Sequence, residues 1–394
     1  LPSLTVRYRL NPIRAKSIVI SATTGKSADK RNNDMAGLYI HIPFCHSKCI
    51  YCDFYSMPRA DAADSYIDAV IKEWHMRRTE INEPFTTLYI GGGTPSILPA
   101  CLLKRLIDGI ALENLEEFTI EANPEDVTPQ WVSSIRNMGI NRVSIGIQSF
   151  SDAELKVINR RHTGDDAEKA LHTLRNNGID NISGDLIYGL PGQTIEYWQQ
   201  SLDRLVSIGV EHISAYSLSF EPGTRLHTML MTGKVKEADE DTVNEMYSRL
   251  TDTLHDAGYE HYEISNFALP GQRARHNSLY WNFTPYLGLG TAAHSFDGKV
   301  RRANRTGIKP YIIDIMAGKS FFDIENETAD SLYNDYIITS LRTAEGIDKR
   351  HFSSRFGDNA LDSLLTASRQ FINAGKMAET PTSLFITETA FLIS

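Results

Sequence analysis

The chain has 394 residues, 41% of them hydrophobic and 23% charged, a composition typical of globular proteins rather than of disordered or fibrous ones. Its formal net charge of −9 argues against nucleic acid as the main partner, because phosphate binding needs a basic surface. Four cysteines are too few for a disulfide framework, and no apolar run is long enough to span a membrane.

Residues 1–36 differ from the rest of the chain in composition. They carry more basic than acidic residues and are rich in Ser, Thr and Asn, with no sustained hydrophobic period. Such a segment is typical of a transit peptide. We favour a disordered or over-annotated leader, because the chain starts with Leu1 and Met35 offers a start just before the first apolar run.

Six β-like runs follow, separated by helical patterns. The runs cover residues 38–42, 87–90, 118–122, 142–148, 182–188 and 212–218. After the first run, Ile67, Val70 and Trp74 recur at the spacing of an amphipathic helix, and a similar pattern covers 98–110. Six β-then-α units predict a parallel sheet with right-handed crossovers.

This alternation fits two architectures, an open doubly wound sheet and a barrel. A closed barrel of this kind needs eight strands, so six strands predict a partial barrel with one open side. Both architectures gather chemistry at the carboxyl ends of the strands, where the polar and glycine-rich motifs of this chain lie.

The alternation is lost past Pro222. Residues 234–259 predict helix, 270–285 predict a loop, and 331–394 predict a small, mainly helical domain with a closing hairpin near 384–393. The predicted domains are the leader at 1–36, the barrel at 37–222, a connecting region at 223–330, and the C-terminal domain at 331–394.

The strongest motif is Cys45-His-Ser-Lys-Cys49-Ile-Tyr-Cys52, directly after the first predicted strand. Three thiolates on one loop can bind three irons of a cuboidal iron–sulfur cluster and leave the fourth iron open to another ligand. The alternative is a zinc site completed by His46. We expect Cys101, on the second predicted helix, to be a buried apolar thiol.

The cysteine loop, with Tyr39-Ile-His-Ile-Pro-Phe before it, resembles the radical S-adenosylmethionine (SAM) superfamily. More narrowly, the chain resembles the branch of oxygen-independent coproporphyrinogen III oxidases and HemW-type haem chaperones, over nearly its whole length from Gly37. The resemblance implies an α/β fold, a partial (β/α)6 barrel with a mainly helical C-terminal accessory domain. It also implies that Cys45, Cys49 and Cys52 bind a [4Fe–4S] cluster whose unique iron is chelated by SAM. An electron from the cluster can then cleave SAM to methionine and a 5′-deoxyadenosyl radical.

Further strand-end motifs match SAM-contacting positions of the superfamily. Gly92, Gly93 and Thr94 lie in a glycine run that lets the backbone approach a ligand closely, and the resemblance assigns this run to the methionyl amine. Glu121, at the end of the third strand, resembles the acid that binds the ribose hydroxyls. The other matching positions are Tyr39, Tyr51, Gln148, Arg160 and Asp185.

Two features favour the chaperone over the oxidase. The oxidase carries a further cysteine two residues after the third, and this chain has Phe54 there. The segment His276-Asn277-Ser-Leu-Tyr280-Trp281 matches the H-N-x-x-Y-W motif of the chaperones. In addition, the leader lacks the length and apolar content of the oxidase's N-terminal segment.

The H-N-x-x-Y-W motif suits haem chemically. A histidine beside aromatic rings supplies an axial imidazole for the iron and flat apolar faces for the macrocycle. His294 is a second axial candidate. Arginines near the motif can pair with haem propionates, and the candidates are Arg273, Arg275, Arg301, Arg302 and Arg305.

The resemblance therefore implies a haem chaperone that passes haem to acceptor haemoproteins such as respiratory enzymes, and it favours this role over enzymatic activity. It implies a cytoplasmic protein in peripheral contact with the membrane, or a mitochondrial one if the leader is a transit peptide; family members dimerise, so a homodimer is an open alternative. The first alternative function is a true oxidase, which decarboxylates coproporphyrinogen III to protoporphyrinogen IX. A zinc-containing structural barrel is the second.

Overall fold

The computed structural model describes residues 35–58, 60–325 and 328–393, so the leader predicted at 1–36 lies almost wholly outside the described part of the chain. All six predicted strands are present and run parallel in sequence order: β1 (Ala36–Ile42), β2 (Phe85–Gly92), β3 (Glu117–Ala122), β4 (Arg142–Gln148), β5 (Asn181–Tyr188) and β6 (His212–Ser217). Their inward and outward residues are mostly buried, as expected for strands covered on both faces. The predicted partial barrel is confirmed.

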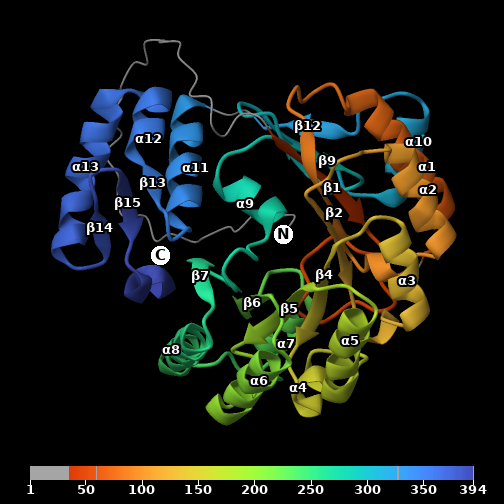
Figure 1. Ribbon diagram of the computed structural model, residues 1–394, viewed down its shortest axis with the longest axis horizontal. Helices are drawn as coiled ribbons and strands as arrows, with labels where there is room; N and C mark the ends of the chain where they lie inside the picture. Colours follow the sequence, from red (N-terminus) through yellow and green to blue (C-terminus); the bar gives the residue numbers. More distant parts are fainter. Residues whose placement is uncertain (1–34, 59, 326–327, 394) are drawn as a thin grey trace.

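Helices on the outer side of these strands cover the barrel (Figure 1). They are α1 (Ala63–Arg77), α2 (Ala100–Ile110), α3 (Pro129–Asn137), α5 (Gly164–Asn176) and α6 (Ile195–Ile208), with the short α4 (Asp152–Val157) and the 3-10 turns η1 (Pro95–Ile97) and η2 (Pro124–Asp126) in the loops. Threonine hydroxyls cap three of the helices by accepting a backbone N–H: Thr128, Thr163 and Thr194.

The prediction that Cys101 is buried is wrong. Cys101 lies in the first turn of α2 and is exposed, whereas Leu103, Leu106 and Ile110 form the buried stripe of the helix. A residue two positions before Leu103 points to the opposite side of a helix, so its thiol faces solvent.

The sheet continues past Pro222 in segments without a clear sequence period. On the β6 side it gains β8 (Asn266–Ala268) and β7 (Glu260–Glu263), after helices α7 (Arg225–Met231) and α8 (Glu240–Asp256). On the β1 side it gains β9 (Tyr286–Leu289), β10 (His294–Phe296), β11 (Arg301–Asn304) and β12 (Phe322–Ile324), with α10 (Ile308–Met316) packed near α1. The result is one 12-stranded sheet, in which β9 runs parallel to β1.

The prediction of a loop over 270–285 is also wrong. This segment contains α9 (Arg275–Trp281), which begins where the N–H groups of Arg275 and His276 donate to the Glu117 carboxylate at 2.8 and 2.9 Å. A carboxylate at the helix N-terminus satisfies backbone donors that the helix itself leaves unpaired. The capping group comes from β3, and nothing in the local sequence indicates it.

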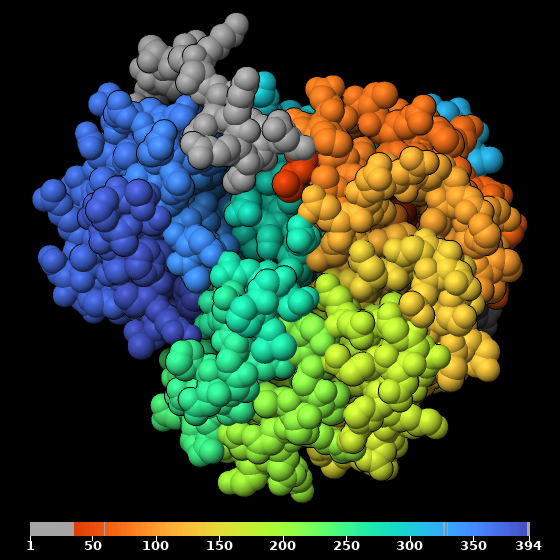
Figure 2. Space-filling model, viewed as in Figure 1, coloured from red at the N-terminus to blue at the C-terminus, as the bar shows by residue number. Residues whose placement is uncertain are grey.

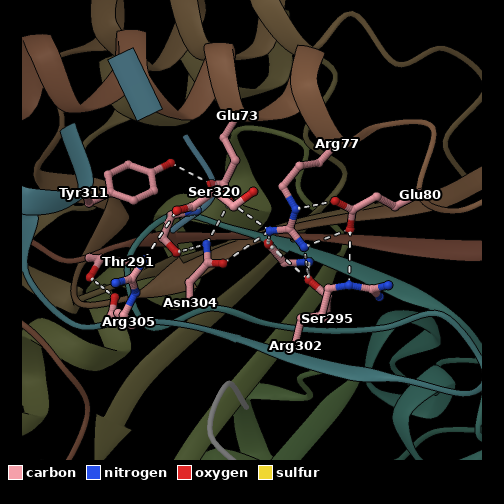
Figure 3. A network of polar contacts seen from close by, with 12 residues as sticks. Glu73, Arg77, Glu80, Thr291, Ser295, Arg302, Asn304, Arg305, Tyr311 and Ser320 are labelled. Carbon is pink, nitrogen blue, oxygen red and sulfur yellow. Dashed lines mark hydrogen bonds and ion pairs between the residues drawn. The ribbon is translucent and has the colours of Figure 1, made fainter. Parts of the chain in front are cut away.

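A buried polar network attaches the added strands to α1 (Figure 3). Glu73 Oε1 lies 2.8 Å from Arg77 Nη1, and Glu73 Oε2 accepts hydrogen bonds from Tyr311 Oη at 2.6 Å and from the Gly290 N–H at 2.8 Å. The Asn304 side chain donates to Glu73 at 2.8 Å. One carboxylate therefore connects α1 with α10, with β11 and with the residue that follows β9.

The C-terminal elements form a separate layer, drawn in blue in Figures 1 and 2. They are α11 (Ala329–Leu341), α12 (Lys349–Phe356), α13 (Asp358–Asn373) and a three-stranded sheet of β13 (Ile347–Asp348), β15 (Ser383–Ile386) and β14 (Met377–Glu379), followed by the 3-10 turn η3 (Glu388–Ile393). The hairpin joins β14 to β15, so it lies earlier than the predicted 384–393. Tyr280 and Phe283 pack into the core of this layer, which places α9 between it and the barrel. Over the described ranges, no helix is long and apolar enough to cross a membrane.

Candidate functional site

A cavity of about 440 Å³ lies inside the barrel and reaches from the cysteine loop to the start of β4. The predicted site residues that line it are Cys45, Cys49, Tyr51, Cys52, Gly92, Gly93, Thr94, Glu121, Gln148, Arg160, Asp185, Asn277 and Trp281. Tyr39, His276 and Tyr280 do not line it. The cavity therefore brings together the predicted cluster and SAM residues, except Tyr39, with two residues of the predicted haem motif.

Backbone hydrogen bonds between the two ends of the cysteine loop fix this loop at the end of β1. The Cys45 N–H donates to the Met57 carbonyl at 3.0 Å, and the Met57 N–H donates to the Pro43 carbonyl at 2.8 Å. Beneath the loop, His41 Nε2 lies 2.9 Å from the Tyr55 carbonyl and His41 Nδ1 lies 3.0 Å from Tyr39 Oη. Tyr39 thus supports the loop from the core, and burial lowers the pKa of His41 to about 4.

Polar hydrogens lie close to two of the thiols. The Thr94 hydroxyl donates to Cys45 Sγ at 3.5 Å, and Arg160 Nη1 donates to Cys49 Sγ at 3.6 Å. Burial raises the pKa of Cys45 and raises that of Cys52 to about 12. Donors and positive charge beside a sulfur favour the thiolate, which is the form that binds metal.

Over the described ranges, no group of three or more His, Cys, Asp or Glu side chains is close enough together to hold a single metal ion. The thiols of a cuboidal cluster bind different irons, so they need not converge on one point. A tetrahedral zinc ion needs four ligands within about 2.3 Å of a common centre. Three thiols on one loop match the ligand type that a cuboidal cluster takes, with one thiol for each of three irons.

The glycine run after β2 passes very close to the cysteine loop. The N–H groups of Gly93 and Thr94 donate to the carbonyls of Ile42 and Phe44 at 2.8 and 2.7 Å. A Cβ on Gly93 would lie 2.5 Å from the Phe44 carbonyl oxygen, and Gly92 has a positive φ of 110°. Only glycine fits these two positions without a backbone shift.

Two carboxylates face the middle of the cavity. Glu121 accepts hydrogen bonds from Tyr89 Oη at 2.8 Å and from the Gly92 N–H at 2.9 Å, so it is fixed relative to the glycine run. The Ser144 hydroxyl donates to Asp185 at 3.0 Å. Burial raises the pKa of Asp185 to about 6, which leaves this carboxyl partly protonated near neutral pH.

Gln148 and Arg160 close the side of the cavity at the end of β4. Gln148 has a φ of 68°, a conformation that a residue other than glycine rarely adopts and that clusters at functional sites. Arg160 Nη2 donates to the Gly146 carbonyl and to Asn123 Oδ1, the latter at 2.9 Å. These bonds, with the contact to Cys49, place the guanidinium beside the thiols.

The four residues of the H-N-x-x-Y-W segment lie on two faces of α9. His276 and Tyr280, one turn apart, face the core: His276 Nδ1 lies 2.8 Å from Thr87 Oγ1, and Nε2 lies 2.9 Å from Tyr280 Oη. Asn277 and Trp281, also one turn apart, line the cavity. Both ring nitrogens of His276 are therefore occupied by hydrogen bonds.

The other residues predicted to contact haem do not line the cavity. His294 is the first residue of β10, and its Nδ1 lies 3.9 Å from Glu325 Oε1, just after β12. Each predicted propionate-binding arginine already has a carboxylate partner: Arg273 with Glu260 and Glu345, Arg275 with Glu116, Arg301 with Asp335, Arg302 with Asp297, and Arg305 with Asp323. Contact of these arginines with haem stays a prediction, and it would require each of them to exchange its carboxylate partner for a propionate.

The polar cavity residues that were not predicted include Arg142, Glu263, Asn266 and Arg342. Arg142 carries one detectable signal, since a charged residue opens an otherwise apolar run at 142–148. Glu263 and Asn266 lie three residues apart on the short strands β7 and β8, whereas Arg342 follows α11, and only the fold brings these residues to Arg142.

The chain is similar to known proteins over most of its length. The model of the radical SAM superfamily matches residues 39–205, and that of the HemN C-terminal domain matches 328–393. Heme chaperone HemW of Bacillus subtilis is 33% identical over 91% of this chain and 97% of its own, and HemW of Lactococcus lactis is 36% identical over 81% and 84%. The structure of coproporphyrinogen III oxidase (HemN) from Escherichia coli, at 23% identity, covers 92% of this chain and 89% of its own with a TM-score of 0.78.

Proposed function

Because the chain belongs to the HemW family of the radical SAM superfamily, we propose that it is a haem chaperone, which holds a SAM-liganded [4Fe–4S] cluster, binds haem and passes haem to acceptor haemoproteins. The observation that carries this proposal is the single cavity that contains both the three-cysteine loop and the cavity-facing residues of α9, Asn277 and Trp281. A ligand of the cluster and a second ligand at α9 would share one enclosed space.

In this proposal Cys45, Cys49 and Cys52 hold the cluster. The residues fit it, because the thiols lie on one loop at the cavity mouth and have Thr94 and Arg160 as nearby donors. When bound, the cluster supplies one-electron chemistry and an iron that is open to an additional ligand.

The residues assigned to SAM form a continuous wall beside the thiols. Gly92 and Gly93 bring the backbone close to the ligand, and Thr94 continues the same run. Glu121 has acceptor capacity for ribose hydroxyls, because each carboxylate oxygen accepts more than one hydrogen bond. The remaining SAM assignments are Tyr51, Gln148, Arg160 and Asp185 at the cavity surface and Tyr39 as the support beneath the loop.

For haem, we assign direct contact to Asn277 and Trp281. The Trp281 indole offers a flat apolar surface on which a macrocycle can stack. The His276 imidazole does not fit an axial ligand in this arrangement, because iron coordination requires its bond to Thr87 or to Tyr280 to break. We therefore assign His276 and Tyr280 to the positioning of α9.

The proposal is tested by titrating haem into anaerobically reconstituted protein and following the Soret absorbance. We expect saturation near one haem per chain, and weaker binding after Trp281→Leu but not after Trp131→Leu, a tryptophan of α3 outside the cavity. Absence of saturable haem binding by the wild-type protein would contradict the proposal.

The oxidase alternative has a direct assay. Coproporphyrinogen III, SAM and a reductant are supplied to the same preparation, and the formation of protoporphyrinogen IX is measured. We expect none, because Phe54 occupies the position of the oxidase's additional cysteine and lines the cavity. Turnover would establish the oxidase instead.

Delivery of haem, a homodimer and peripheral contact with a membrane are further parts of this proposal. Delivery is measured as transfer of haem from the loaded protein to an apo-respiratory cytochrome. Dimerisation is measured by light scattering, and membrane contact by sedimentation with anionic vesicles. Each result stands independently of the haem titration.

A further inference from the structure

The end of the cavity away from the cysteines is formed by polar side chains whose hydrogen-bonding atoms lack partners. Arg142, the first residue of β4, is 1% exposed, and its Nε has no hydrogen-bond partner within the described ranges. No carboxylate of those ranges lies within ion-pair distance of its guanidinium. A buried guanidinium in this state is energetically costly unless a ligand or water satisfies it.

The α9 wall of this region adds two more unpartnered atoms. Trp281 Nε1 and Asn277 Oδ1 are buried and have no hydrogen-bond partner in the described part of the chain. Both residues line the cavity and lie one turn apart. A buried indole N–H normally finds an acceptor, so its position here indicates that a ligand supplies one.

Arg342, the residue after α11, completes the region. Its guanidinium lies over the Trp281 ring with its carbon 5.0 Å from the ring centroid, and its buried Nε has no partner among the described residues. The positions of Trp281 and Arg342 are thus linked by direct contact. Arg142 and Arg342 together bring two positive charges to one cavity.

The acidic groups of the cavity do not balance these charges through direct pairs. Glu263 is buried and accepts from the Ser265 N–H at 3.2 Å and from the Asn266 side chain, and burial raises its pKa, which favours the neutral form. Glu121 and Asp185 are bonded to the groups described above. Glu263 Oε2 and Asn266 Oδ1 are also buried without partners, yet no carboxylate of the described ranges lies within ion-pair distance of either guanidinium.

We propose that Arg142 and Arg342, with the indole N–H of Trp281, form a carboxylate-binding subsite at this end of the cavity, which receives a propionate of haem. The planar guanidinium matches a carboxylate with two parallel hydrogen bonds, which is why arginine suits this role. A propionate is a short flexible arm, so only the arm has to reach Arg142. The inference rests on the proposed function for the identity of haem as the ligand.

The test compares haem with haem dimethyl ester, in which both propionates are neutral esters. Affinities for the anaerobically reconstituted wild-type protein are measured by Soret titration at equal ionic strength. We expect haem to bind about 10- to 100-fold more tightly than the ester, because a buried charge-assisted hydrogen bond is lost in the ester.

Three variants locate the effect in the protein. In Arg142→Met and Arg342→Met the preference for haem over the ester, taken as the ratio of the two affinities within each variant, falls at least severalfold. Arg142→Lys keeps the charge without the planar fork and retains part of the preference. Arg369→Met, an exposed arginine of α13, is the matched control and keeps the full preference. If Arg142→Met fails to fold, Arg342→Met and Arg142→Lys still decide the question.

The outcomes separate this inference from the proposed function. Equal affinity of the wild-type protein for haem and its ester overturns the subsite, because water then satisfies Arg142, but leaves haem binding intact. A preference that survives in both methionine variants overturns it as well. Loss of SAM affinity in Arg142→Met, with the haem preference unchanged, assigns the carboxylate to SAM and overturns the haem assignment. Failure of the wild-type protein to bind either porphyrin defeats the proposed function itself.

Discussion

Glu73 and Arg77, one turn apart on α1, form an ion pair whose oxygen and nitrogen are 2.8 Å apart and whose side chains are 0% and 4% exposed. Without the Glu73 carboxylate, Arg77 keeps only its ion pair with Glu80 at 3.0 Å among the described residues, and the buried donors of Tyr311 and Gly290 lose their charged acceptor. We expect Glu73→Gln to lower the free energy of unfolding by about 1.5 to 3 kcal/mol, measured by urea denaturation followed by circular dichroism.

The matched control is an exposed pair of the same type. Lys104 and Asp108 on α2 are 2.7 Å apart but 63% and 61% exposed. Asp108→Asn should change the free energy of unfolding by less than about 1 kcal/mol. Equal effects of the two substitutions would mean that Glu73 does not hold the added strands to α1.

The cluster assignment predicts a difference between two cysteines. Cys49→Ser should reduce the iron and acid-labile sulfide of anaerobically reconstituted protein to near background, because the cluster loses one of its three protein ligands. Cys101→Ser should leave both contents unchanged, since Cys101 is exposed on α2 and does not line the cavity. A wild-type protein with only trace iron and sulfide would refute the cluster.

Glu121 is expected to contribute to SAM binding through its charge. Glu121→Gln keeps the shape of the side chain but replaces a carboxylate acceptor by a neutral amide. We expect SAM affinity, measured by anaerobic equilibrium dialysis, to fall about 10- to 100-fold with the iron content retained. Glu113→Gln, in the exposed turn before β3, is the control, and an equal loss there would remove the assignment.

His276 makes the stability of the protein depend on pH. Burial lowers the pKa of the folded imidazole to about 3, whereas in the unfolded chain it is close to 6.5. Between these values the unfolded state binds more protons, so the free energy of unfolding decreases as the pH falls below 6.5.

A variant isolates this contribution. At pH 7.5, His276→Gln should be less stable than wild type by about 1 to 3 kcal/mol, because the bonds to Thr87 and Tyr280 are disturbed. Below pH 6.5 that difference should narrow by at most about 1.4 kcal/mol per pH unit in urea denaturation. A difference that stays constant down to pH 4.5 would show that the folded imidazole is accessible to protons.

The sequence predicts the parallel core of the fold well because each of its strands is a long apolar run that is buried on both faces. It does not predict β9 to β12, since strands of three or four residues carry no period and their pairing is set by distant segments, as in Gly37 with Tyr286. Helix α9 is not predicted for a similar reason. Its seven residues are too few to show a helical pattern, and its N-terminal cap comes from the distant Glu117.

For the site too, the residues of local motifs are predictable from the sequence, whereas residues brought together by the fold are not. Residues on local motifs, such as the three cysteines and the glycine run, are found from spacing alone. The arginines near the haem motif are conspicuous in sequence, but each is already paired with a carboxylate in the fold. Arg142 and Arg342 belong to one cavity only because β4 and the end of α11 meet across α9, which no local pattern indicates.

The pairing of β1 with β9 has a consequence for synthesis on the ribosome. The first strand to emerge exposes an unsatisfied edge until a partner more than two hundred residues later leaves the exit tunnel. Long-range closure of this kind slows folding and leaves a nascent chain prone to pair with other chains. Truncation before β9 should therefore yield aggregates rather than a smaller soluble barrel.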